Sequence, residues 1–133
     1  MKLNYDLETY ISWITIDNSI IIERRLANET AFDGIVKIYS LKSNNSFLNK
    51  AFEDKYFGEF IHIANTGFFL RMFKNKTSWP VADLVYVDYA SQYFENIKET
   101  NSSWNVWYGQ DLGKGKHIIE ISPKEKIEYQ INH

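Results

Sequence analysis

Cysteine is absent from all 133 residues of the chain. Its absence excludes disulfide bonds, thiolate metal sites and cysteine nucleophiles. Small secreted domains often depend on disulfides, so the reducing cytoplasm is the easier home, and we expect a cytoplasmic protein. The first ten residues carry Asp6 and Glu8 and do not resemble a signal peptide. The most apolar stretch, 57–73, is broken by polar and charged residues, so we expect no membrane partner.

Catalytic and cofactor motifs are also missing. The chain has no His-Glu-x-x-His and no Gly-x-Ser-x-Gly. The run Gly-Lys-Gly-Lys at 113–116 lacks the rest of a phosphate loop and precedes a predicted strand, which favours a hairpin turn. His62, His117 and His133 do not have zinc-ligand spacing, and His62 is expected on a sheet face. We therefore expect no enzyme activity, no cofactor and no metal.

Paired carboxylates are the remaining chemical possibility. Asp83 and Asp88 are five positions apart, so on one strand they face opposite sides of the sheet. This spacing argues against a simple two-acid site. A metal site assembled with Glu95 or Asp111 is the alternative.

Alternating apolar and polar residues predict a fold rich in strands. Residues 9–26 fit two strands with a turn at Asp17–Asn18, and a helix from Ser19 is the alternative. The stretch after Gly34 is ambiguous between helix and strand, and the strand is favoured. Further strands are predicted over a hairpin at 60–73 that bends at 65–67, and over 83–90, 104–109, 116–122 and 127–131.

Two segments have helical periodicity. In the first, Ser46 is a suitable N-cap and Gly58 a stop for an apolar stripe that recurs every three to four residues. The second, 91–99, would turn Tyr93, Phe94 and Ile97 inward. The whole chain, 1–133, is therefore predicted to be a single α+β domain, mainly antiparallel sheet with two helices.

Aromatic residues make up 17% of the chain and gather, with acids, in the window 83–111. This window carries five acids against one base, Lys98, although the net charge of the whole chain is only −2, too small for a general nucleic-acid binder. Acids interleaved with Tyr and Trp suit a surface that covers a basic protein. Buried rings beside a solvated strand face would produce the same pattern.

The partner-binding hypothesis specifies both the contact residues and the orientation of one strand. In 104–109, Trp104, Val106 and Tyr108 are expected to pack inward, with Asn105 and Trp107 facing a partner. The candidate partner-binding residues are Asp83, Asp88, Tyr89, Tyr93, Glu95, Glu99, Trp107 and Asp111.

The stretches DLVYVDYASQYFENIKE and WNVWYGQD give the chain a general character that resembles bacterial immunity proteins. Those proteins neutralise polymorphic or contact-dependent-inhibition toxins. The resemblance implies a cytoplasmic, non-catalytic inhibitor that binds one cognate toxin domain, often a nuclease, and it transfers no residue role. A β-rich module that binds carbohydrate through exposed Trp, and a phage-encoded inhibitor of a host defence enzyme, are the alternatives.

Overall fold

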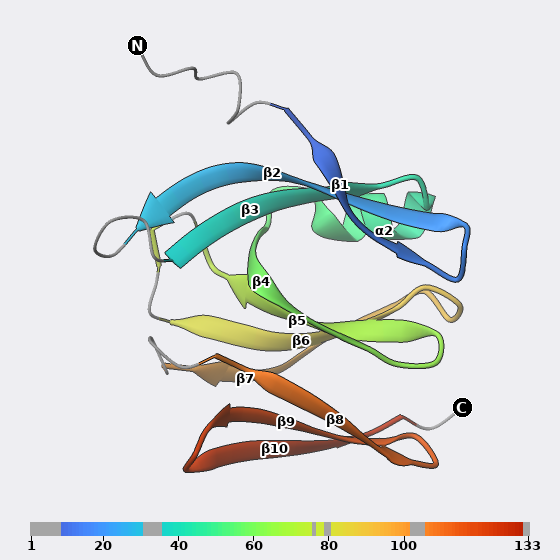
Figure 1. Ribbon diagram of the computed structural model, residues 1–133, viewed down its shortest axis with the longest axis vertical. Helices are drawn as coiled ribbons and strands as arrows, with labels where there is room; N and C mark the ends of the chain where they lie inside the picture. The colour runs from blue at the N-terminus through green and yellow to red at the C-terminus, as the bar shows by residue number, and fades with distance from the viewer. Residues whose placement is uncertain (1–8, 31–35, 76, 79–80, 102–105, 132–133) are drawn as a thin grey trace.

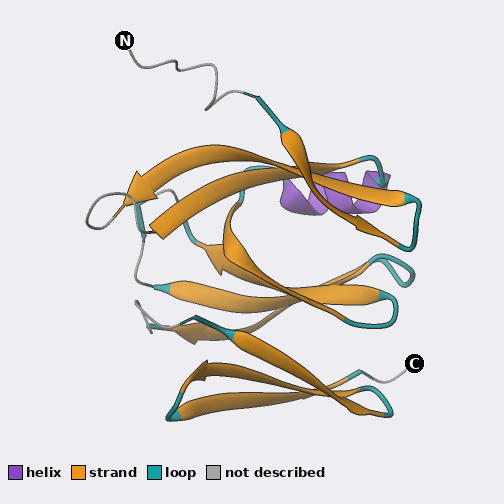
Figure 2. Ribbon diagram, in the orientation of Figure 1, coloured by secondary structure: helices purple, strands orange, loops and turns teal. Residues whose placement is uncertain are grey.

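The computed structural model consists of two antiparallel sheets and one short helix (Figure 1, Figure 2). It describes residues 9–30, 36–75, 77–78, 81–101 and 106–131. The larger sheet runs in the order β1-β2-β3-β4-β5-β6-β7 and the smaller in the order β10-β9-β8. The elements are β1 (Ile11–Ile16), β2 (Ile20–Thr30), β3 (Val36–Ser43), α2 (Ser46–Phe52), β4 (Tyr56–Ile63), β5 (Gly67–Phe73), β6 (Ala82–Asp88), β7 (Tyr93–Thr100), β8 (Tyr108–Gly113), β9 (Lys116–Ser122) and β10 (Glu125–Gln130).

The predicted turns are confirmed. Asp17 and Asn18 both have positive φ, 56° and 59°, as a two-residue hairpin between β1 and β2 requires. The alternative of a helix from Ser19 is therefore wrong, and the stretch after Gly34 enters a strand, β3. The bend at 65–67 is closed by Ala64 N–H, which donates to the Gly67 carbonyl at 2.8 Å. The run at 113–116 forms the turn between β8 and β9.

Strand β6 lies at the centre of the fold, and all seven of its residues are buried. Register with β5 places Val85 opposite Leu70 on one face and Tyr86 opposite Phe69 on the other. Each face belongs to a different hydrophobic core, so the strand carries no solvated side. Such double burial explains its nearly continuous apolar sequence.

The first core, which we call the helix-side core, joins α2 to strands β1–β6. Leu48 and Phe52 of the helix pack with residues such as Phe57, Phe68 and Val85. The helix begins after Asn45, whose side-chain oxygen accepts a hydrogen bond from Leu48 N–H at 3.0 Å. In Figure 1, β2 and β3 curve over this core at the top of the view. A single register pair, Tyr39 with Phe57, joins β3 to β4, so the described pairing between these two strands is minimal.

The second core, the intersheet core, lies between β8–β10 and the opposite face of the larger sheet. Its buried members include Phe69, Tyr86, Trp107 and Ile119. Rings meet closely there: the Phe69 centroid lies 4.9 Å from that of Tyr86 and 5.5 Å from that of Tyr129. The smaller sheet, at the bottom of Figure 1, thus covers apolar surface that would otherwise face water.

The prediction of two helices is wrong. Residues 93–99 of this segment form most of β7 and residues 91–92 a turn, because tertiary pairing with β6 over seven register pairs overrides a short amphipathic pattern. The first helix is shorter than predicted, ends at Phe52 instead of near Gly58, and is capped by Asn45 rather than Ser46. Among the described residues the chain is mostly antiparallel sheet with one short helix, not α+β with two.

The predicted orientation of the segment before β8 is also wrong. Trp107 is 3% exposed, whereas Val106 and Tyr108 are 68% and 62% exposed. The inward face of β8 is set by Gly109, where an added Cβ would lie 2.3 Å from the His62 ring. Because side chains alternate, Trp107 must then point inward as well. Trp104 and Asn105 lie outside the described residues.

Gly67 provides a test of the close contact between β5 and β6. An added Cβ would lie 2.2 Å from the Val87 carbonyl oxygen and 2.9 Å from Asp88 Cα, both of them backbone atoms that cannot move away alone. We expect Gly67→Ala to lower the free energy of unfolding by about 3 kcal/mol in denaturant titrations. Gly58→Ala is the control, because its nearest neighbours are side-chain atoms at 3.3 Å and beyond. Equal stability of the two variants would contradict this packing.

Candidate functional site

A bulge in β7 divides the predicted acidic window between the two cores. Leu84 pairs with Lys98 but Val85 pairs with Asn96, which leaves Ile97 as an extra residue. A bulge of this kind shifts the alternation of side chains along the strand. Glu95 and Glu99, four positions apart, consequently face opposite sides of the larger sheet. The predicted residues therefore do not form one patch.

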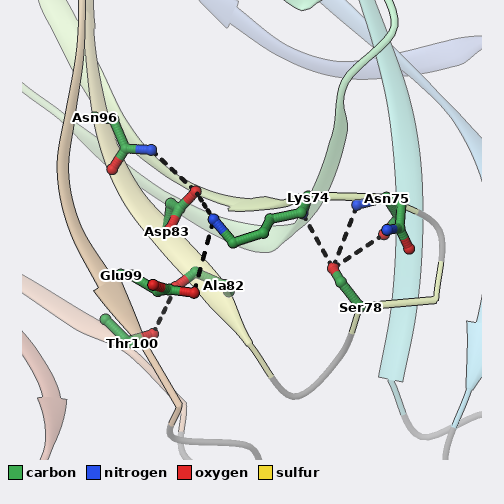
Figure 3. A network of polar contacts seen from close by, with 8 residues as sticks. All are labelled: Lys74, Asn75, Ser78, Ala82, Asp83, Asn96, Glu99 and Thr100. Atoms are coloured by element: carbon green, nitrogen blue, oxygen red, sulfur yellow. Dashed lines mark hydrogen bonds and ion pairs between the residues drawn. The ribbon is translucent and has the colours of Figure 1, made fainter.

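Asp83 and Glu99 belong to a structural network beside the helix-side core (Figure 3). Lys74 Nζ lies 3.5 Å from Asp83 Oδ2 and 3.7 Å from Glu99 Oε2. Asn96 also donates to Asp83 Oδ2, at 2.9 Å. Asp83 is buried, so its charge is offset by Lys74 rather than offered to a partner. Its prediction as a surface residue is wrong.

Asp88 lies on the opposite face of β6, as the five-residue spacing predicts, but it too is buried. Its Oδ2 accepts hydrogen bonds from Tyr86 at 2.7 Å and Thr66 at 2.8 Å. Its Oδ1 accepts from the N–H groups of Ala90 and Ser91 at 3.1 and 2.9 Å. Burial alone would raise the pKa of Asp88, but hydrogen bonds from Ser91, Tyr86 and Thr66 bring this pKa below its usual value. The residue thus fixes the β6–β7 turn as an anion.

Glu95 lies in a cleft that described residues of β6, β7 and β10 form. Tyr129 Oη donates to Glu95 Oε1 at 2.5 Å, and Tyr93 Oη donates to the same oxygen at 2.7 Å. The pKa of Tyr129 is raised, first by burial and then by its bond to Glu95, and the pKa of Tyr93 is raised chiefly by that bond. Both hydroxyl groups therefore stay protonated and hold the carboxylate in place.

The Tyr–Glu cleft, as we call this site, has a volume of about 490 Å³. This volume is in the usual range for ligand sites. Its residues come from β6, β7, β10 and the turns beside them. They are Tyr86, Ser91, Tyr93, Glu95, Tyr129, Gln130 and Ile131.

The cleft combines an exposed aromatic wall with an acid at its side. Tyr93 is 46% exposed, and Glu95 is half-buried. Within the described residues no ion pair joins Glu95 to a basic side chain. A fixed carboxylate between two tyrosines is suited to receive a cation.

The remaining predicted residues lie elsewhere. Tyr89 is half-buried and packs against the helix-side core. Trp107 is interior, where its ring meets that of Phe60 edge to face at 5.5 Å and lies 4.7 Å beneath the Arg71 guanidinium carbon. Burial lowers the pKa of Arg71 to about 10.

Asp111 is exposed on β8. The structure therefore brings Tyr93 and Glu95 together in the cleft and joins Asp83 to Glu99 through Lys74.

A pair of histidines joins the two sheets. Nε2 of His62 on β4 lies 3.0 Å from Nδ1 of His117 on β9, a hydrogen-bond distance, and His117 is buried. The pKa of His62 is lowered by burial and by the neighbouring His117 ring, partly offset by Asp111. Sequence reasoning expected His62 on a sheet face, but it missed the pairing, which depends on the contact between sheets.

Sequence reasoning also missed Tyr129 and Tyr86. The alternation of Ile127 and Tyr129 on the last strand was the available signal, because both point into the intersheet core. Which carboxylate would meet Tyr129 could not be predicted without the placement of β10 over β7.

Neither a metal site nor a membrane helix is found in the part of the chain that the structure describes. No three His, Asp or Glu side chains among those residues converge to hold a metal ion. The described helix is too short to cross a membrane. In comparisons with known proteins, no family model, no curated protein and no solved structure matches the chain.

The His62–His117 pair predicts a pH-dependent stability. Unfolded His62 takes up a proton near its ordinary pKa of 6.5, while the folded residue resists protonation. The unfolded state therefore binds more protons as the pH falls below that value, and the free energy of unfolding decreases. We expect the denaturant concentration at the unfolding midpoint to decrease as the pH is lowered from about 7.5 to about 5.5. His62→Gln should flatten this dependence, and an unchanged slope would contradict it.

The hydrogen bonds of Asp88 predict that its substitution lowers the stability of the fold. In Asp88→Asn, an amide replaces a buried anion that accepts four hydrogen bonds, and the new N–H₂ group meets donors. We expect a loss of about 2 kcal/mol in the free energy of unfolding. Asp111→Asn, at an exposed position, is the control and should change this free energy little. A neutral effect of Asp88→Asn would show that the charge is unnecessary.

Proposed function

We propose that the protein is a non-catalytic inhibitor that binds another protein through the Tyr–Glu cleft. The observation that carries this proposal is the Glu95 carboxylate, held by two tyrosine hydroxyl groups and joined to no basic side chain of the described chain. A basic side chain of the partner would supply the missing positive charge.

The geometry supports binding without rearrangement. Tyr93 and Tyr129 lie on two different strands and fix Glu95 before a partner arrives. Groups that are already ordered lose little conformational entropy on association. Aromatic rings beside a fixed charge are also the composition of interface hot spots.

The cleft replaces the broader acidic surface as the basis for an immunity role. Only Tyr93 and Glu95 of the eight candidate residues lie among those that line it. A nuclease toxin presents lysine and arginine side chains where it holds phosphates. An inhibitor that inserts its carboxylate among those side chains would compete with the nucleic acid. The toxin-immunity assignment remains part of this proposal.

The test is complex formation with the product of the gene immediately upstream. We expect the purified proteins to form a complex that Glu95→Gln weakens by about tenfold or more, because a charge-assisted contact is lost. Higher ionic strength should slow association of the wild type. Calorimetry and stopped-flow fluorescence measure the two effects.

Glu99→Gln is the matched control, since it removes an equal charge from the same strand on the opposite face. A complex that responds equally to both substitutions would reveal only a general charge effect. A complex that ignores Glu95→Gln would overturn the proposal, as would the absence of any complex.

A carbohydrate is the second candidate ligand. The exposed Tyr93 ring beside Glu95 and Gln130 could stack on a sugar and accept or donate hydrogen bonds. Sugar binding would shift the intrinsic fluorescence and would persist at high salt. Unchanged intrinsic fluorescence across a broad panel of glycans would exclude carbohydrate as the ligand.

A further inference from the structure

We infer that the Tyr–Glu cleft recognises the planar guanidinium group of an arginine in the partner protein. This inference rests on the proposed function and specifies the chemistry of the side chain that enters. It derives from a comparison between two Tyr–Glu arrangements within this chain, one occupied by an arginine and one not.

The occupied arrangement lies on β2, β3 and β4. Tyr39 Oη donates to Glu59 Oε2 at 3.0 Å, and the guanidinium carbon of Arg24 lies 4.3 Å from the Tyr39 ring centroid. The same guanidinium lies 5.1 Å from the Trp13 ring. Burial and Glu59 raise the pKa of Tyr39 to about 12, so its hydroxyl group remains a donor. Here a guanidinium thus lies over the ring of a tyrosine whose hydroxyl group bonds a carboxylate, and no ion pair joins Arg24 to Glu59 among the described residues.

The Tyr–Glu cleft also combines tyrosine rings, tyrosine hydroxyl groups and a carboxylate, but no described arginine lies in it. Tyr93 and Tyr129 both donate to Glu95 Oε1, as Tyr39 donates to Glu59. No cation is found over either ring among the described residues, where the cation–ring contacts all involve other rings. Both hydrogen bonds that Glu95 receives from described residues end on Oε1, so Oε2 is the acceptor left for a ligand.

The chain has no arginine left to fill this position. Its three arginines are Arg24, Arg25 and Arg71, and each already lies over an aromatic ring elsewhere. Two lysines of the adjoining strands are engaged, Lys98 with Glu125 at 3.0 Å and Lys116 with Glu128 at 3.6 Å. Lys126 on β10 is three positions from Tyr129 and therefore lies on the opposite face of that strand. The occupant must therefore come from another molecule.

Arginine fits this cleft better than lysine on physical grounds. A guanidinium is planar and weakly hydrated, so it stacks on tyrosine rings while its N–H groups reach a carboxylate. An ammonium group is compact and strongly hydrated, and it gains less from two flanking rings. The cleft offers rings and one carboxylate rather than a cage of oxygens.

The experiment is an NMR titration of the full chain with N-acetyl-arginine methylamide and, separately, N-acetyl-lysine methylamide. We expect the arginine probe to shift the amide and ring signals of Tyr93, Glu95 and Tyr129, with at least about fivefold higher affinity than the lysine probe. Glu95→Gln should weaken arginine binding by about tenfold. Glu99→Gln should leave it unchanged. Thermal unfolding of each variant establishes that it is folded.

Comparison of Tyr93→Leu with Tyr93→Phe separates stacking from charge, because both variants lose the hydroxyl bond to Glu95 and only Tyr93→Leu loses the ring. We expect Tyr93→Leu, and not Tyr93→Phe, to remove the preference for arginine over lysine. Equal affinity of the two probes for the wild type would overturn the inference and leave the proposed function standing. Binding of neither probe at the cleft would also overturn it. A partner complex that is insensitive to Glu95→Gln would instead overturn the proposed function itself.

Discussion

The fold depends on the complete burial of β6. A strand with no solvated face must place every side chain in one of two cores. In β6 the two acids near its ends, Asp83 and Asp88, are therefore buried as well. An isolated buried carboxylate is strongly unfavourable, so each end of β6 needs its own set of donors. Lys74 and Asn96 serve Asp83, whereas Tyr86, Thr66 and two backbone N–H groups serve Asp88. Both acids therefore stabilise the sheet and are withdrawn from any surface.

The bulge at Ile97 determines which acids can act outside the fold. Without the extra residue, Glu95 and Glu99 would lie on one side of β7 and present a continuous negative edge. With it, Glu99 joins the Lys74 network and Glu95 alone enters the space between β7 and β10. One inserted residue thus converts a diffuse acidic stretch into a single carboxylate fixed by two tyrosines. A local feature of strand pairing therefore sets the chemistry of the site.

Sequence reasoning predicted most strands and turns, because those depend on neighbouring residues. The positive-φ turn at Asp17–Asn18, the bend at 65–67 and the opposite orientations of Asp83 and Asp88 follow from local geometry. It failed where distant segments decide the outcome. Residues 93–99 become a strand through pairing with β6, and Trp107 turns inward because Gly109 lies against His62. The cleft itself needs β10 over β7, a contact between residues 34 positions apart such as Glu95 and Tyr129.

A structural role alone does not explain the charge in the cleft. Tyr129 and Glu95 tie β10 to β7, but a neutral amide oxygen would accept the same two hydroxyl groups. The same strands are already joined by the Lys98–Glu125 ion pair at 3.0 Å. A half-buried anion without a cation is less favourable than an amide in that position. By contrast, Asp88 accepts four hydrogen bonds and Asp83 meets Lys74 and Asn96 through Oδ2. Glu59 accepts from Tyr39, and Arg24 lies over the ring of that tyrosine. The charge on Glu95 is thus the feature that the proposed cation of a partner would explain.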